Sequence, residues 1–268
     1  MSPHVASFFH PASNTFSYVV HDPATRQAAV IDPVLDYDAD TDTVDAEPLQ
    51  PLLAHVRGRR LDIRWLLETH AHADHVSAGR WLKQQWPQAM LGMGKGIIEV
   101  QRTFAPRYAL EVPTDGSQFD HLFADGERFA LGDVAAEVIA VPGHTSDSVA
   151  YRFGDALFTG DSLFMPDGGT ARCDFPGGDA ALLYRSIQRL LTLPDATRVF
   201  ICHDYGPGGR EVANETTIGE QRARNIHLHE GVSEAEFVAT RRARDATLPE
   251  PKLMHPSVKA NLQGGRDP

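Results

Sequence analysis

The stretch His70-Ala71-His72-Ala73-Asp74-His75 decides the fold, because it places four side chains able to bind a metal within six residues. Imidazole and carboxylate groups suit divalent zinc, iron or manganese better than calcium or copper(I). A lone histidine is more often a surface residue or a hydrogen-bonded core residue. Four such side chains on one tight connection would repel one another and lack partners without a cation, so the stretch predicts a metal site.

The other clusters of His and Asp also follow short apolar segments that are typical of strands. Ile63 to Leu67 delivers Glu68-Thr69-His70, and helix-like periodicity resumes from Val76 to Trp86. Three later segments repeat the arrangement: Ala135 to Val141 before Pro142-Gly143-His144, Ala156 to Phe158 before Thr159-Gly160-Asp161, and Val199 to Cys202 before His203-Asp204. We therefore expect rigid strands to present the ligands from their C-terminal ends.

The remaining elements are interpreted as scaffold. Ala28 to Ile31 predicts a buried strand that ends at Asp32, and the acidic stretch from Asp36 to Glu47 is expected to be a solvated loop. Helices are predicted over 49–56, from the N-cap Asp179 to Pro194, and after the capping-box pattern Ser233-x-x-Glu236. The end of the chain, Gly264 to Pro268, is expected to fray.

Composition limits the classes of partner. The 268 residues carry a net charge of −11 without a basic stripe, which argues against nucleic acid and membrane surfaces and favours a small-molecule substrate. The two cysteines, Cys173 and Cys202, are too few for a disulfide framework and fit a reducing compartment. No secretory signal or long apolar segment is present, so we expect a cytoplasmic protein with one domain over 1–268 and a C-terminal tail from about 245.

In their order along the chain these motifs resemble the metallo-beta-lactamase superfamily. The residues that carry the resemblance are Asp32, Thr69 to His75, Pro142-Gly143-His144-Thr145, Thr159-Gly160-Asp161 and His203-Asp204. The resemblance extends from about Phe16 to His203 and implies an α/β (α+β) fold, the αββα sandwich, with metals at the loop edge. In dinuclear hydrolases of the superfamily, the positions matching His70, His72 and His144 hold one metal. Those matching Asp74, His75 and His203 hold a second, and Asp161 bridges.

Within the superfamily the chain most resembles the persulfide dioxygenases, the sulfur dioxygenase branch with its bacterial beta-lactamase-hydrolase-like members. The resemblance rests on residues 68–75, Gly168-Gly169-Thr170-Ala171-Arg172-Cys173-Asp174-Phe175, Leu193-Pro194 and His203-Asp204-Tyr205. It implies a single catalytic iron(II) held by His70, His144 and Asp161, with open positions for substrate and O₂. Glutathione persulfide would then be oxidised to sulfite and glutathione.

The same resemblance gives the other histidines and Asp74 a supporting role. His72, Asp74, His75 and His203 would orient ligands and water if one iron is bound, and would be metal ligands in a dinuclear site. Zinc can occupy the site in purified protein but is inert in a redox role.

Two residues are candidates for substrate binding. Arg172, beside Asp174, either binds the glutathione carboxylates or forms a buried pair that shapes the pocket. Tyr205, next to His203, either contacts substrate or packs within its loop. Cys173 stands where the persulfide dioxygenases commonly have Thr. It is expected to lie in a packed loop rather than exchange sulfur, and Cys202 is expected to act as a small buried hydrophobe.

The strongest alternative is a glyoxalase II-like thioester hydrolase with a dinuclear site, since all of its metal ligands are available. Against it, the segment after His203 is short and shows no convincing counterpart of that family's basic helical extension. A beta-lactamase is disfavoured because those zinc enzymes normally lack an aspartate at the position of Asp161. Lactone and nucleic-acid hydrolases have less support. A non-catalytic scaffold is disfavoured by the intact ligand set, and a homo-oligomer is compatible with the sequence.

Overall fold

Two six-stranded sheets form the centre of the computed structural model, which describes residues 2–266. The first sheet has the order β1-β2-β3-β6-β8-β9. Its strands are β1 (His4–His10), β2 (Thr15–His21), β3 (Gln27–Ile31), β6 (Asp62–Leu67), β8 (Met90–Gly94) and β9 (His121–Phe123). The pairs β1·β2 and β2·β3 are antiparallel, whereas β3·β6, β6·β8 and β8·β9 are parallel. The sheet is therefore mixed.

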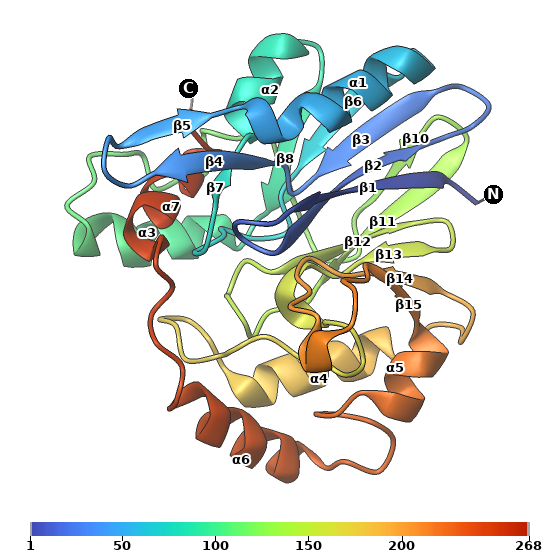
Figure 1. Ribbon diagram of the computed structural model, residues 1–268, viewed down its shortest axis with the longest axis vertical. Helices are drawn as coiled ribbons and strands as arrows, with labels where there is room; N and C mark the ends of the chain where they lie inside the picture. Colours follow the sequence, from blue (N-terminus) through green and yellow to red (C-terminus); the bar gives the residue numbers. More distant parts are fainter. Residues whose placement is uncertain (1, 267–268) are drawn as a thin grey trace.

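The second sheet has the order β10-β11-β12-β13-β14-β15 and faces the first (Figure 1). Its strands are β10 (Arg128–Leu131), β11 (Val134–Ala140), β12 (Val149–Phe153), β13 (Ala156–Phe158), β14 (Arg198–Phe200) and β15 (Glu215–Thr217). All neighbours are antiparallel except β13 and β14, which are parallel. The strands that precede His144, Asp161 and His203 all belong to this sheet.

Helices cover the outer face of each sheet (Figure 1). They are α1 (Gln50–Arg59), α2 (Gly79–Gln85), α3 (Ile97–Arg107), α4 (Ala180–Leu190), α5 (Ile218–Arg224), α6 (Glu234–Asp245) and α7 (Met254–Asn261), with short 3-10 turns η1 (Glu47–Leu49), η2 (Gly160–Ser162) and η3 (Pro207–Gly209). Among the described residues, no helix is long and apolar enough to cross a membrane.

Three apolar clusters explain why these layers stack. One contains inward residues of both sheets, such as Phe16, Phe123 and Tyr151, and forms the layer between them. A second packs the other face of the first sheet against α1, α2, α3 and α7. The third packs the second sheet against α4, α5 and α6. Alternation along each strand supplies both faces, so the predicted αββα sandwich is confirmed.

Two expectations about the scaffold are wrong. The acidic stretch is not a loop, because β4 (Val34–Asp38) pairs with β5 (Thr43–Asp45) and with β7 (Val76–Ser77). Its Tyr37 and Val44 pack against the first-sheet core while the aspartates point outward, which is the period of a strand. The same contact with β7 shortens the helix predicted over 76–86 to Gly79–Gln85.

The end of the chain is also more ordered than expected. Residues 254–261 form α7, and the backbone of Gly264 accepts a hydrogen bond from Arg80 while Gly265 donates to Ala260. Gly264 to Arg266 is therefore held against the fold, and the predicted fraying of 267–268 lies outside the described residues. The predicted caps are confirmed: Asp179 accepts from the amide of Leu182, and Ser233 and Glu236 form a capping box.

Candidate metal centre

Four connections at one edge of the sandwich bring the predicted ligands together. The turn 68–75 follows β6 in the first sheet, whereas His144, Asp161 and His203 follow β11, β13 and β14 in the second. Asp161 lies in η2 behind Gly160, whose φ is +50°. A side chain at Gly160 would meet the hydroxyl of Thr69 at 2.6 Å, so glycine permits this close approach of the two sheets' loops.

The donor atoms form two adjacent groups, and within each the atoms lie within 4.8 Å of one another. One group consists of His70, His144 and Asp161, and the other of His72, Asp74, His75 and His203. Asp161 touches both groups, since Oδ2 is 3.6 Å from His144 Nε2 and Oδ1 is 3.3 Å from His203 Nε2. All seven residues named from the sequence therefore converge.

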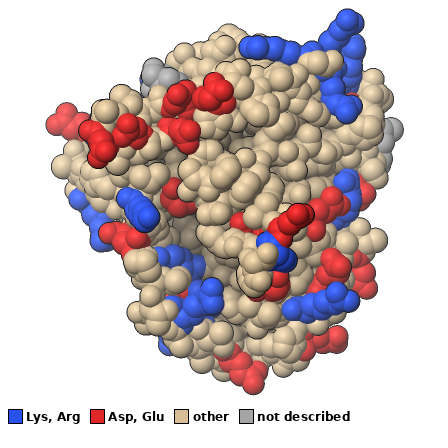
Figure 2. Space-filling model, viewed as in Figure 1, with Lys and Arg blue, Asp and Glu red and all other residues tan. Residues whose placement is uncertain are grey.

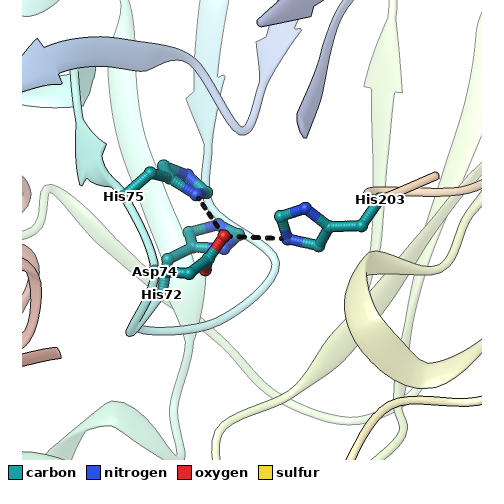
Figure 3. A group of neighbouring side chains, drawn as sticks. All are labelled: His72, Asp74, His75 and His203. Carbon is teal, nitrogen blue, oxygen red and sulfur yellow. Dashed lines mark hydrogen bonds and ion pairs between the residues drawn. The ribbon is translucent and has the colours of Figure 1, made fainter. Parts of the chain in front are cut away.

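The second group surrounds the carboxylate of Asp74 (Figure 3). Its Oδ2 lies 3.4 Å from His75 Nδ1 and 3.4 Å from His203 Nε2. His72, Asp74 and His75 come from one turn, and His203 approaches from the opposite side. A cation bound here would join the two halves of the sandwich.

Hydrogen bonds fix one ring nitrogen of each histidine in the first group. His144 Nδ1 donates to the backbone carbonyl of Arg172 at 2.7 Å. His70 Nδ1 lies 3.1 Å from Thr69 Oγ1, which in turn donates to Asp32 Oδ2 at 2.9 Å. Because the hydroxyl proton goes to Asp32, His70 Nδ1 is the donor and its Nε2 keeps a free lone pair.

The histidines of the second group follow the same rule. His72 Nε2 bonds to Asp32 Oδ1 at 3.1 Å, leaving Nδ1 free. His203 Nδ1 faces the carbonyl of Asn14 at 3.3 Å, and His75 Nδ1 lies 3.5 Å from Thr15 Oγ1. The β1–β2 hairpin thus orients two imidazoles.

The atoms left over are those a metal needs. His70 Nε2, His72 Nδ1, His75 Nε2, His203 Nε2 and Asp161 Oδ1 are buried, and none has a hydrogen-bond partner among the described residues. Buried polar atoms without partners are rare in native proteins, and cations bound at the two donor groups would account for these five. The residues therefore fit a bound metal ion.

The electrostatics favour neutral imidazoles at two of these positions. Burial, and then the neighbouring His72 and His144, lower the pKa of His70 well below its usual value. Burial and His72 likewise lower the pKa of His75 to about 4. A neutral imidazole is the form that binds a metal, so these two ligands need not lose a proton first.

His72 and Glu68 occupy a different environment. Burial lowers the pKa of His72, but the carboxylates of Asp32 and Glu68 outweigh it and raise the pKa well above its usual value. Burial raises the pKa of Glu68 to about 7, and Glu68 Oε2 lies 3.6 Å from His72 Nε2. Asp32 and Glu68 therefore hold the imidazole of His72 on the side away from its free Nδ1.

Sequence reasoning assigned no role to several residues that support the ligands. Asp147 Oδ2 accepts from the amide of Ala71 at 2.8 Å, and Asn261 bonds to the backbone of the turn 72–77. Asp147 could have been noticed because it follows His144 by three residues. Asn261 lies 186 residues from His75, and nothing in its surrounding sequence marks it.

Arg172 lies beside the centre with its guanidinium engaged. Nε and Nη2 donate to the two oxygens of Asp174 at 2.6 and 2.7 Å, Nη1 donates to the carbonyl of Pro249 at 2.6 Å, and the group sits 4.7 Å over the ring of Phe175. Its backbone carbonyl also orients His144. The pair with Asp174 is present, but it is not the buried pair that was predicted, because the Asp174 side chain is 38% exposed.

A buried ion pair supports the same segment from α6. Arg241 pairs with Asp245, donates to the carbonyl of Thr170 at 2.8 Å, and is 1% exposed. Asp245 Oδ2 accepts from the amide of Cys173 at 3.0 Å. The carbonyl of Arg172 is thus held between two anchored residues.

Tyr205 and the cysteines lie at the margins of the centre. Tyr205 is 63% exposed, and its ring is stacked 6.2 Å from that of His203. Both cysteines are free and buried, as predicted. Burial raises the pKa of Cys173 to about 12, so its thiol stays protonated, and Cys202 Sγ lies 3.8 Å from Asp32 Oδ2.

Surface charge agrees with a small substrate rather than a polyanion. Figure 2 shows acidic side chains gathered over the β4–β5 hairpin and basic ones in separate groups, without a continuous basic stripe on this face. Three helices, α5, α6 and α7, follow His203 in the described part of the chain, so the segment after this residue is largely helical.

Curated relatives cover almost the whole chain. It is 47% identical over 268 residues to a beta-lactamase hydrolase-like protein of Xylella fastidiosa, and the chain spans 62% of that protein's length. It is 43% identical to glyoxylase B2 of Dictyostelium discoideum, over 96% of this chain and 89% of the relative. It is 32% identical to human mitochondrial persulfide dioxygenase ETHE1, over 96% of this chain and 87% of the relative.

Solved structures give the same picture. ETHE1 from Myxococcus xanthus superimposes with a TM-score of 0.78 at 32% identity, covering 98% of this chain and 100% of that one. TTHA1623, solved in a di-iron-bound form, gives a TM-score of 0.57 at 27% identity, over 85% of this chain and all of that one.

The family model described as the metallo-beta-lactamase superfamily matches residues 10–203. This range contains all seven predicted ligands and every strand of the two sheets except β15 and most of β1. Together with the αββα layers it shows the family, and the donor atoms without partners fit a metal-dependent member of it. The chain belongs to the metallo-beta-lactamase superfamily.

Proposed function

We propose that the chain is a persulfide dioxygenase that binds one iron(II) through His70, His144 and Asp161. Two imidazoles and one carboxylate form a set that leaves iron with open positions, and this set is the observation that carries the proposal. The similarity to persulfide dioxygenases over 96% of the chain supports it.

The reaction proposed is the oxidation of a glutathione persulfide, RSSH + O₂ + H₂O giving RSH and H₂SO₃, where RSH is glutathione. The terminal sulfur is oxidised to sulfite, and the four electrons released reduce O₂. Iron, when bound, supplies the redox chemistry that zinc lacks. The chain's own residues position the ligands: Thr69 holds His70, and the carbonyl of Arg172 holds His144.

The substrate is proposed to approach over the exposed ring of Tyr205, close to His203. Arg172 is proposed to attract the carboxylates of glutathione with the donor capacity that Asp174 and Pro249 leave unused. His72, Asp74, His75 and His203 then orient the turn and its water.

A glyoxalase II-like hydrolase acting on S-lactoylglutathione is the second candidate. The observation in its favour is the complete second donor group, whose orphaned nitrogens fit another cation. The similarity to glyoxylase B2 also favours it. Two metals would then activate water for attack on the thioester.

One experiment separates the two. Metal-free protein is loaded anaerobically with iron(II) and given glutathione persulfide while O₂ uptake and sulfite are measured, and S-lactoylglutathione hydrolysis is followed in parallel. The proposal expects O₂ uptake matched by sulfite, and no uptake with zinc-loaded protein. Thioester hydrolysis without O₂ uptake would overturn it in favour of the hydrolase, and absence of both would overturn both.

His70→Ala and His72→Ala refine the assignment of the iron. If one iron is held by His70, His144 and Asp161, His70→Ala loses iron while His72→Ala retains most of it. Equal loss of iron from both variants would contradict the mononuclear site.

A further inference from the structure

The last residue of α7, Asn261, contacts the turn that carries three of the metal-binding side chains. Its Nδ2 donates to the backbone carbonyls of His72 and His75, both at 2.8 Å. Its Oδ1 accepts from the amide of Ser77 at 2.8 Å. The side chain is buried, and its amide therefore uses both donors and one acceptor on a single turn.

These contacts fix the backbone from which His72, Asp74 and His75 project. The two carbonyls that Asn261 bridges belong to His72 and His75, and Asp74 lies between them in sequence. Fixing both carbonyls sets the distance across the turn and the direction in which its side chains leave the backbone. Without the amide, three buried backbone groups would lose their partners.

A second set of contacts links the same place to His72 through its ring. The hydroxyl of Ser77 donates to Glu68 Oε1 and accepts from the amide of Gly79 at 2.9 Å. The other oxygen of Glu68 lies 3.6 Å from His72 Nε2. The residue whose amide binds Asn261 therefore also helps to hold the carboxylate behind His72.

Packing of α7 alone does not require an amide at this position. Met254 and Val258 already bury this helix against the first-sheet core, and α7 lies beside β7 in Figure 1. A buried Asn costs free energy unless its polar groups are paired, and here every pairing is with the metal-binding turn. Asn261 also lies beyond residues 10–203, the part that matches the family model.

We propose that Asn261 is a positioning residue of the metal centre, which sets metal affinity by holding the backbone of the turn from His72 to Ser77. The proposal applies to either candidate function: the turn carries ligands if two metals bind, and it holds the groups next to the ligand His70 if one iron binds. A failure of the dioxygenase proposal would leave it intact.

The test compares Asn261→Asp with Val258→Ala. Aspartate is nearly isosteric but cannot donate, and its oxygen would face two carbonyl oxygens. Val258→Ala removes apolar side-chain volume from the same helix but leaves the three hydrogen bonds from Asn261 to the turn in place. Zinc is the only metal added, and its affinity is measured by competition with a chelator. If the wild-type chain binds two zinc ions, the affinity compared is that of the more weakly bound ion. Absorption spectra of the cobalt(II)-loaded proteins report the ligand geometry.

The expected result is a loss of zinc affinity of at least tenfold in Asn261→Asp with an altered cobalt(II) spectrum. Val258→Ala, which also destabilises α7 by removing a buried side chain, should stay within twofold of wild type. Unchanged affinity in Asn261→Asp, or equal losses in both variants, would overturn the proposal. If Asn261→Asp does not fold, Asn261→Ser, which keeps one donor, takes its place under the same criteria.

Discussion

Replacing Thr69 by Val removes the hydroxyl that joins His70 to Asp32 while keeping nearly the same shape. In the wild-type chain Thr69 Oγ1 accepts from His70 Nδ1 at 3.1 Å and donates to Asp32 Oδ2 at 2.9 Å. Val breaks both bonds at once. The backbone bond from Thr69 to Asp32 Oδ1, at 2.7 Å, remains, so the turn itself should persist.

The expected cost has two parts. Loss of a group that orients a metal ligand commonly weakens metal affinity by about 10–100-fold, which equals roughly 1.4–2.8 kcal/mol at 1.4 kcal/mol per decade. The metal-free protein should lose about 1–3 kcal/mol of stability, because the buried His70 N–H and Asp32 oxygen lose their partner. Metal affinity and unfolding of the metal-free form are measured separately, by anaerobic iron(II) competition against a chromophoric chelator and by urea titration.

Thr69→Ser is the matched control, because it keeps the hydroxyl and removes only the methyl group. It should bind iron(II) within about threefold of wild type while losing roughly 0.8 kcal/mol of stability for the buried methyl. The reasoning is refuted if Thr69→Val binds iron within twofold of wild type. It is equally refuted if Val and Ser weaken binding alike, since packing rather than the hydroxyl would then matter.

Two further predictions concern residues outside the ligand set. Burial, and then the charge of Arg241, lowers the pKa of His227 to about 4. Between pH 6.5 and 4 the imidazole is therefore protonated in the unfolded chain but neutral in the folded chain. The free energy of unfolding should fall as the pH drops through this window. In that window the stability of wild type relative to His227→Asn should decline by about 1.4 kcal/mol per pH unit; urea titrations giving a pH-independent difference would contradict this. Arg172→Ala should raise KM for the persulfide about tenfold, or 1.4 kcal/mol, with kcat little changed. An unchanged KM, or an equal rise in Asp174→Ala, would mean that the pair only shapes the loop.

The ligands were predictable because their signal is local. His70 to His75 lies in six consecutive residues, and the other ligands each follow a short apolar strand, so period and spacing give both element and function. The αββα layers, by contrast, came from the family resemblance. Strand periodicity predicts buried faces but does not determine which sheets pack together.

What could not be predicted depends on contacts without a local pattern. The stretch 36–47 was predicted to be a loop because of its many aspartates. Those aspartates conceal the strand-like alternation of side chains in which Tyr37 and Val44 point inward. His144 is oriented by a backbone carbonyl, that of Arg172, and a backbone group has no residue type to recognise. Asn261 reaches its turn only through the tertiary fold.

The supporting contacts come from both ends of the chain, so segments far apart in sequence hold the ligand set in place. The β1–β2 hairpin holds His203 and His75 through Asn14 and Thr15, while α6 anchors the segment whose carbonyl holds His144. The ligands themselves are divided between the two sheets. A bound metal therefore links two halves that apolar packing already aligns, and any free energy gained on binding adds to the stability of the folded chain by linkage. Because the ligands are divided in this way, we expect a substitution far from the metal, such as one at Asn261, to change metal affinity when it shifts a ligand-bearing turn relative to its sheet.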